Sequence, residues 1–340
     1  MEQLSAGKKL DQAFEKLGKE KSISFELDLD VDAKTLKLLD AEADPEPGEA
    51  IPDDAAELIS GAKISFTVES KKPIDESDEK DFVGMAMKVS TPDGDLVEYR
   101  VVGDYTYVRS DIATLAKAMD APLPPADELP EEAKGLKKAL EGEWVKFNTK
   151  ELEKTGREMA QEPGAKPAPE PSLDAKTQKK LTDALRKVIA REVDFKTAGG
   201  ENGTEHITAT APFRSLLSEL IGEIRPLTKD LPPGVELPTD KDLKEVPNVA
   251  TTADFTLKNG ELTEVYVDLA KLTENAKVTK FGLSLKMSGG TKPTAPAGAT
   301  ELDLEELMGG FFGAMMPDEG LGEGDFSTEG LEDGSAEGTA

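Results

Sequence analysis

The chain has 340 residues, of which 69 are acidic and 41 basic, giving a formal net charge of −28. A surface of this charge repels phosphate groups, which excludes nucleic acids as ordinary partners and direct docking on anionic bilayers through a basic patch. The absence of cysteine excludes disulfides and thiolate metal sites, and no run of about 18 apolar residues encodes a transmembrane helix.

The N-terminal half reads as one helix followed by a series of strands. Apolar residues recur at helical spacing over residues 2–19 and then alternate with polar residues over 22–30. A short helix at 33–39 and an acidic, proline-rich loop at 41–54 are expected next. Alternation then predicts strands near 64–68, 83–89, 97–101 and 105–109, with a hairpin turn at 91–94. Short turns between successive strands are typical of an antiparallel meander.

The rest of the chain repeats this pattern loosely. Helices are predicted within 112–140, at 151–159, at 175–191 and at 213–224. Strands are predicted at 144–147, 193–197, 205–211, 253–257, 265–269 and 281–287, with a turn at 199–203 and a loop at 231–247. Asn259 and Gly260 form a dipeptide that strongly favours a two-residue hairpin turn.

We expect both halves to share one sheet, because two separate sheets would leave more open edges. The prediction is a single α+β domain over residues 1–316, with insertions near 112–140, 161–175 and 231–246. Residues 317–340 contain eight acidic residues, no basic ones and six glycines, which predicts a disordered acidic tail.

The segment 302–316 is the most hydrophobic stretch of the chain, and three glycines interrupt it. It is either a final helix packed on the core or a plug at the mouth of a cavity. Each glycine lowers helix stability by about 1 kcal/mol relative to alanine. The plug hypothesis predicts that truncation after Thr300 increases the uptake of a fluorescent fatty acid.

Catalytic signatures are scarce. His206 is the only histidine, and its place in a strand beside Thr208 and Thr210 indicates a surface position. The acidic stretches 28–32 and 75–81 lack the glycine and terminal glutamate of a calcium loop, so solvated charge is expected there. Trp144 is expected to be a core anchor at a strand start. The sequence therefore predicts no catalytic residue, no metal site and no cofactor.

Two groups of segments are typical of a known family. Residues 98–109, a hairpin that contains Tyr105, Tyr107 and Val108, precede the Gly-Glu-Trp-Val-Lys-Phe sequence at 142–147. Downstream, a strand ends in the Lys-Asn-Gly-Glu-Leu sequence at 258–262, and further strands follow at 263–269 and 281–287. Over about residues 5–310 this pattern resembles the actinobacterial LppX/LprA/LprF/LprG-type lipoproteins with a LolA/LolB-like fold. The chain departs from that family in being longer and in lacking the lipobox cysteine.

The resemblance implies a curved, half-open antiparallel sheet, barrel-like, of about 10–11 strands, with helices covering its concave face and enclosing an apolar cavity. It also implies the mature part of an extracytoplasmic lipoprotein that carries a lipid or other hydrophobic ligand. Such a protein would touch the cell membrane only through an N-terminal lipid anchor that this sequence lacks, and we expect a monomer.

Candidate cavity residues are the apolar, alternating strand positions, together with two aromatics of the apolar C-terminal segment. Methionines at such positions suit an adaptable surface. The candidates are Phe25, Leu27, Phe66, Met85, Met87, Tyr99, Val265, Val267, Leu283, Leu285, Met287, Phe311 and Phe312. Two alternatives stay open. One is an interaction module of the cell envelope without a lipid ligand, and the other is a hydrolase whose carboxylates meet only in the fold.

Overall fold

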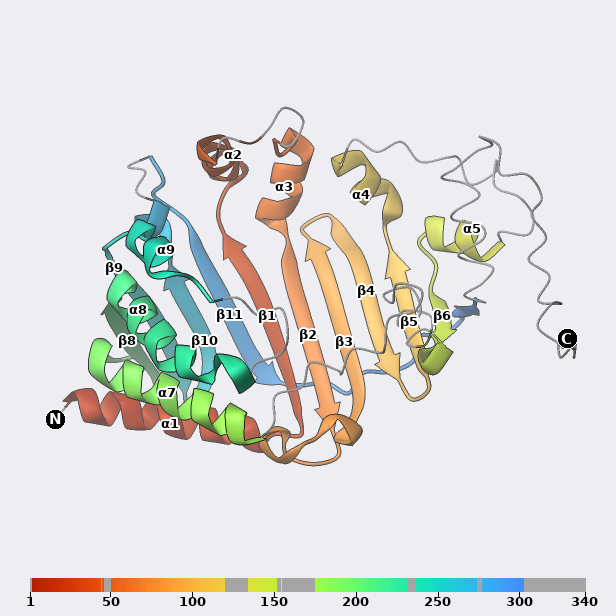
Figure 1. Cartoon of the computed structure of the whole chain (residues 1–340). Helices are drawn as coiled ribbons and strands as arrows, with labels where there is room; N and C mark the ends of the chain where they lie inside the picture. The colour runs from red at the N-terminus through yellow and green to blue at the C-terminus, as the bar shows by residue number, and fades with distance from the viewer. Residues whose placement is uncertain are drawn as a thin grey trace, which may run out of the picture.

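The computed structural model describes residues 2–43, 45, 50–119, 134–151, 154, 175–230, 237–273 and 277–302. Within them the chain forms one open, curved sheet of 12 strands (Figure 1). The strands are β1 (Ser22–Asp30), β2 (Lys63–Ser70), β3 (Phe82–Thr91), β4 (Gly94–Val102), β5 (Tyr105–Ser110), β6 (Val145–Asn148), β7 (Asp194–Gly199), β8 (Thr204–Pro212), β9 (Ala250–Lys258), β10 (Glu261–Asp268), β11 (Gly282–Gly289) and β12 (Thr300–Glu301). The predicted α+β class with one shared sheet is therefore confirmed.

The strand order is β12-β6-β5-β4-β3-β2-β1-β11-β10-β9-β8-β7. The first strand joins the two halves of the chain, because β1 pairs on one side with β2 and on the other side with β11. All neighbouring pairs are antiparallel except β12 and β6, which pair in parallel. The two-residue strand β12 is the one described strand that the alternation pattern does not predict.

Two hairpin turns use the backbone geometry that their sequences favour. Asn202 and Gly203 have φ values of 55° and 77°, and Asn259 and Gly260 have φ values of 53° and 74°. Two successive residues with positive φ match the right-handed twist of the flanking strands, which fixes the register of β7 with β8 and of β9 with β10. Both turns lie where the sequence predicts them.

The helices fall into two groups, as Figure 1 shows. The first group, α1 (Glu2–Lys19), α7 (Ala175–Glu192) and α8 (Phe213–Ile224), gathers over the β7–β10 end of the sheet, where α1 contacts β7 and β10. The second group, α2 (Ala33–Glu42), α3 (Asp53–Gly61) and α4 (Ile112–Ala118), lies near strand ends. The short helices α5 (Lys134–Leu140) and α9 (Asp240–Glu245) complete the described set. Among the described helices, the cover expected over the sheet therefore lies mainly on one half of it.

The main core lies beneath α1. Ala6, Leu10 and Ala13 of this helix pack with Ile207, Leu257, Leu262 and Met287 of the sheet. Ile207 and Leu257 are 0% and 1% exposed, so this half of the apolar face is removed from water. A smaller cluster of Val145, Phe147 and Leu302 lies at the other edge of the sheet.

Some predicted elements differ from the structure or lie outside the described residues. The sequence does not predict α3, and α9 lies inside a segment expected to be loop, because both helices are short. The expected insertions at 112–140 and 231–246 contribute α4, α5 and α9 in their described parts. The predicted helix at 151–159, the insertion at 161–175 and the tail at 317–340 lie mostly or wholly outside the described residues. The domain boundaries remain predictions.

An ion pair closes the connection between β2 and β3. Lys72 Nζ lies 2.8 Å from Asp81 Oδ2, and the backbone N–H of Asp78 donates to the same oxygen at 3.1 Å. The hydrogen bond from Lys72, followed by the one from Asp78, lowers the pKa of Asp81 below its usual value. The sequence predicts solvated charge for the acidic stretch 75–81, and the structure pairs Asp81 of this stretch with Lys72.

We expect Asp81→Asn to lower the melting temperature slightly at neutral pH and to have no effect in strong acid. A lowered pKa in the folded state contributes stability above the unfolded-state pKa and loses it as the pH falls below about 4. Melting temperatures of both proteins between pH 7 and pH 2.5 would check this. A difference that grows as the pH falls would contradict the assignment.

Candidate functional site

Side chains of adjacent strands form continuous apolar rows across the middle of the sheet. In one row, successive cross-strand neighbours from β11 to β4 are Met287, Phe25, Phe66, Met87 and Tyr99. The next row consists of Leu285, Leu27, Ile64, Val89 and Val97. Because residues directly opposite each other, and residues two apart in one strand, point to the same side, both rows lie on one face.

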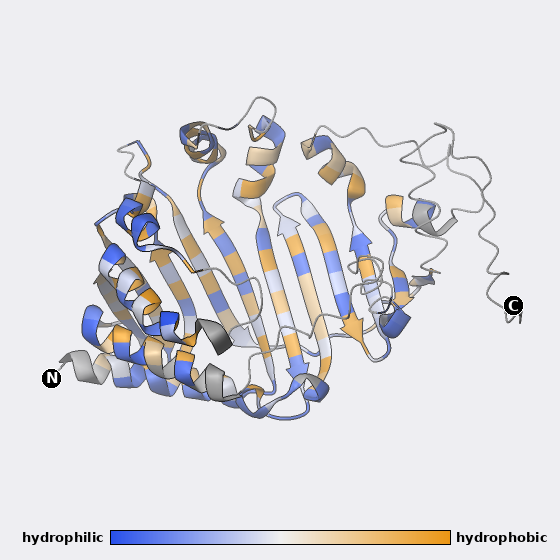
Figure 2. Cartoon of the chain, in the orientation of Figure 1, coloured by the Kyte–Doolittle hydropathy of each residue, from blue (hydrophilic) through white to orange (hydrophobic). Residues whose placement is uncertain are grey.

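We call the part of these rows on β1–β4, together with Met85 two residues before Met87 on β3, the central apolar face. It consists of Phe25, Leu27, Ile64, Phe66, Met85, Met87, Val89, Val97 and Tyr99. Figure 2 shows the alternation of hydrophobic and hydrophilic residues along these strands that gives them one apolar side.

The central apolar face differs in burial from the half of the sheet beneath α1. Its members are half-buried, apart from Ile64, which is 41% exposed. Ile207 belongs to the same cross-strand row as Ile64, through Phe255, Val265, Leu285 and Leu27, yet it is 0% exposed. A single apolar row thus runs from a packed core into an incompletely covered surface.

The structure divides the predicted cavity residues into three groups. Phe25, Leu27, Phe66, Met85, Met87 and Tyr99 lie on the central apolar face. Val265, Val267, Leu283, Leu285 and Met287 lie on β10 and β11 of the same face, where Met287 is buried in the cluster under α1 and Val265 and Leu285 pack against it. Phe311 and Phe312 lie outside the described residues.

The predicted set lacks Ile64, Val89 and Val97, which complete the second row. The alternation along β2, β3 and β4 contains all three residues. The strand register shows that they continue the same row, and a single sequence does not supply that register.

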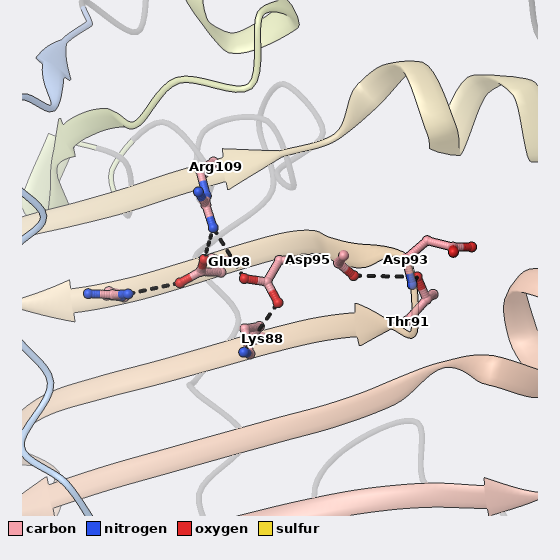
Figure 3. A network of polar contacts seen from close by, with 8 residues as sticks. Lys88, Thr91, Asp93, Asp95, Glu98 and Arg109 are labelled. Atoms are coloured by element: carbon pink, nitrogen blue, oxygen red, sulfur yellow. Dashed lines mark hydrogen bonds and ion pairs between the residues drawn. The ribbon is translucent and has the colours of Figure 1, made fainter.

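The opposite face of the same strands carries a network of charged groups (Figure 3). Glu98, whose side chain is 9% exposed, accepts hydrogen bonds from Arg109 and, at 2.8 Å, from Arg100. Arg109 also reaches Asp95 at 3.3 Å, and Lys88 lies 3.2 Å from the same carboxylate. The network therefore links β3, β4 and β5 through their polar side.

Trp144 belongs to this polar face, so the expectation of a core anchor is wrong. The guanidinium groups of Arg100 and Arg109 lie 4.8 Å and 5.3 Å from the centre of the indole ring. Such distances are within the range of cation–π attraction. The tryptophan is half-buried beside these two cations. It directly precedes β6, and the pairing of β6 with β5 brings it close to Arg109.

Side chains that ligate metals do not gather into a site in the described part of the chain. His206 is exposed on β8, as predicted, and its Nδ1 lies 3.3 Å from Thr256 Oγ1. Among the described residues, no group of three or more His, Cys, Asp or Glu side chains could hold a metal ion. No helix formed by those residues is long and apolar enough to cross a membrane.

No protein-family model matches the chain, and the search of curated proteins gave no match. Among solved structures, the chain is similar to the lipoprotein LppX of Mycobacterium tuberculosis, with 13% identity and a TM-score of 0.32, over 86% of this chain and 98% of LppX. It is also similar to LprF of Mycobacterium bovis, with 10% identity and a TM-score of 0.30, over 87% of this chain and 98% of LprF. These are proteins of the type that the strand and turn pattern resembles.

Proposed function

We propose that the protein binds and carries a lipid or a similar hydrophobic ligand on the central apolar face, and that it is not an enzyme. One observation carries this proposal: two apolar rows continue from the packed core onto β1–β4, where their side chains keep access to solvent. Large exposed apolar surfaces are uncommon on soluble domains and mark sites that bind something.

The chemistry of the face suits acyl chains. Its members are aliphatic, aromatic or thioether side chains, and Met85 and Met87 can adapt to ligands of different shape. Four strands span about 14 Å across the sheet, and the five residues from Met85 to Val89 span about 14 Å along it. Burial of about ten methylene groups would contribute about 8 kcal/mol, part of which offsets the entropy lost on association.

The proposal includes an extracytoplasmic location, an N-terminal lipid anchor and a monomeric state, all three as implied by the family resemblance. A carrier function needs no catalytic group. Glu98, the most buried carboxylate of the polar network, is paired with two arginines.

Substitution of Ile64 tests the ligand-binding face directly. We expect Ile64→Gln to weaken the binding of a fluorescent fatty acid about fivefold, because the variant loses about 1 kcal/mol of apolar contact with the ligand. Leu185→Gln on α7 is the matched control, since Leu185 is 44% exposed and lies outside the face. Fluorescence titration of both variants, with melting temperatures measured in parallel, gives the comparison.

Equal binding by the two variants would contradict the placement of the ligand on the central apolar face. Native mass spectrometry of the purified protein adds a second measurement, in which bound acyl-chain lipid is the expected result. A protein that retains no lipid and takes up no fatty acid would instead favour an interaction module of the cell envelope.

A further inference from the structure

The connection from β11 to β12 crosses the polar face of the sheet. Residues 290–299, which we call the strap, begin beside β1, where the backbone N–H of Gly290 donates to Ser22 O at 2.9 Å. A side chain at position 290 would collide with Ser22, since a Cβ there would lie 2.1 Å from Ser22 Oγ. The strap ends at the sheet edge, where the N–H of Thr300 donates to Trp144 O at 2.9 Å.

Between these ends, polar side chains of the sheet hold the strap above β2, β3 and β4. Arg100 Nη1 donates to the carbonyl oxygen of Thr294 at 3.1 Å, and Lys292 Nζ lies 3.4 Å from Glu69 Oε1. The strap is therefore attached at both ends and near its middle.

A pocket of about 320 Å³ lies between the strap and the sheet. Its floor includes Ser65, Thr67, Lys88 and Arg100, and its roof is formed by residues 291–294. This volume is about ten times the 30 Å³ that a water molecule occupies in the liquid, which leaves room for a small organic molecule. The polar side chains of the floor lie on the face of the sheet opposite to the central apolar face, because Ser65, Thr67, Lys88 and Arg100 alternate with Ile64, Phe66, Val89 and Tyr99.

The charge of the pocket is opposite to that of the chain. Lys88, Arg100 and Lys292 supply three cationic groups to its wall, and Glu98 supplies one carboxylate. That carboxylate is already paired with Arg100 and Arg109. When the ion-pair partners Arg109, Asp95 and Glu69 are included, the site has four cationic side chains and three carboxylates. The cations are Lys88, Arg100, Arg109 and Lys292, and the carboxylates are Glu69, Asp95 and Glu98. The protein as a whole has a net charge of −28. A local excess of positive charge favours an anion at this place.

We propose that this pocket binds a small, soluble phosphate ester. Lys88 and Lys292 supply cations for the phosphate oxygens, and Arg100 is held in place by Glu98, Thr294 and the indole ring of Trp144. The hydroxyl groups of Ser65, Thr67 and Thr291 suit the polar body of such a molecule. We favour a soluble ester over a lipid headgroup because the strap forms a roof that would keep a flat bilayer from the cations.

Isothermal titration calorimetry of the full chain, in a phosphate-free buffer of low ionic strength, tests the proposal with glycerol 3-phosphate and with inorganic phosphate. We expect both probes to bind and glycerol not to bind. Lys88→Gln is expected to weaken binding of both probes about tenfold, since it removes a charge-assisted hydrogen bond. Lys292→Gln is expected to act in the same direction.

The matched control is Lys63→Gln on β2, which makes the same change of charge on the same face of the sheet but outside the pocket lining. Equal weakening by Lys63→Gln and Lys88→Gln would show general electrostatic attraction and overturn the proposal. No heat of binding at millimolar probe concentration would also overturn it. Sedimentation with vesicles of phosphatidic acid and phosphatidylcholine, without binding of the soluble probes, would assign the cations to a membrane surface instead.

Discussion

Ile207→Ala is expected to lower the free energy of unfolding by about 3–4 kcal/mol, within the range found for large-to-small substitutions in packed cores. Ile207 is 0% exposed and packs under α1 with Leu10, Ala13 and Leu257. The side chain lies between α1 and the sheet. Neighbouring groups can therefore fill only part of the space that the substitution leaves.

The matched control is Ile64→Ala, the same substitution in the same cross-strand row. Ile64 is 41% exposed on the central apolar face, so its loss is expected to cost about 1 kcal/mol or less. Urea denaturation of both variants gives the two free energies. Equal costs would mean that the central apolar face is packed as tightly as the core, which would contradict a surface open to a ligand.

Glu98→Leu is expected to lower the free energy of unfolding by about 3 kcal/mol. Removal of one partner from a buried ion pair costs about 3–5 kcal/mol, and we expect the lower limit because Arg100 and Arg109 keep 28% and 35% side-chain exposure. The substitution would leave two guanidinium groups on neighbouring strands without their common carboxylate.

Asp95→Asn removes a negative charge from the same network at a more exposed position. Its comparison with Glu98→Leu shows how much of the loss in stability depends on burial. Asp95 also contacts Arg109, at 3.3 Å, but its side chain is 33% exposed. Exposed ion pairs contribute about 0–1 kcal/mol, so this variant is expected to stay within that range of the parent protein. Chemical denaturation of both variants checks the difference, and a larger loss for Asp95→Asn would show that the network does not depend on Glu98.

The sequence predicts those elements of the fold whose formation depends on local pattern. Strict alternation identifies β1 and β3, and the Asn-Gly pairs identify two hairpins, because two-fold periodicity and positive φ are properties of neighbouring residues. The two-residue strand β12 is missed, because it is too short to alternate and forms only through its parallel pairing with β6.

The candidate site was predictable to the same limited extent. Alternation places Phe66 and Met87 on one side of their strands, but it does not show that α1 covers Met287 and leaves Ile64 partly exposed. The pocket under the strap could not be predicted, because Lys88 and residues 291–294 are distant in sequence. Trp144 was misplaced for a related reason, since an aromatic residue at a strand start fits a core or a cation-lined surface equally well.

The pairing of β1 with β11 has a consequence for how the chain assembles. Phe25 and Met287 are direct neighbours at the centre of the sheet, so β1 gains its second partner only after the much later strand β11 has been synthesised. Contacts between residues so distant in sequence form late and slow the folding of a chain. During synthesis, one edge of β1 would stay open to other chains, which makes this period the one most prone to aggregation.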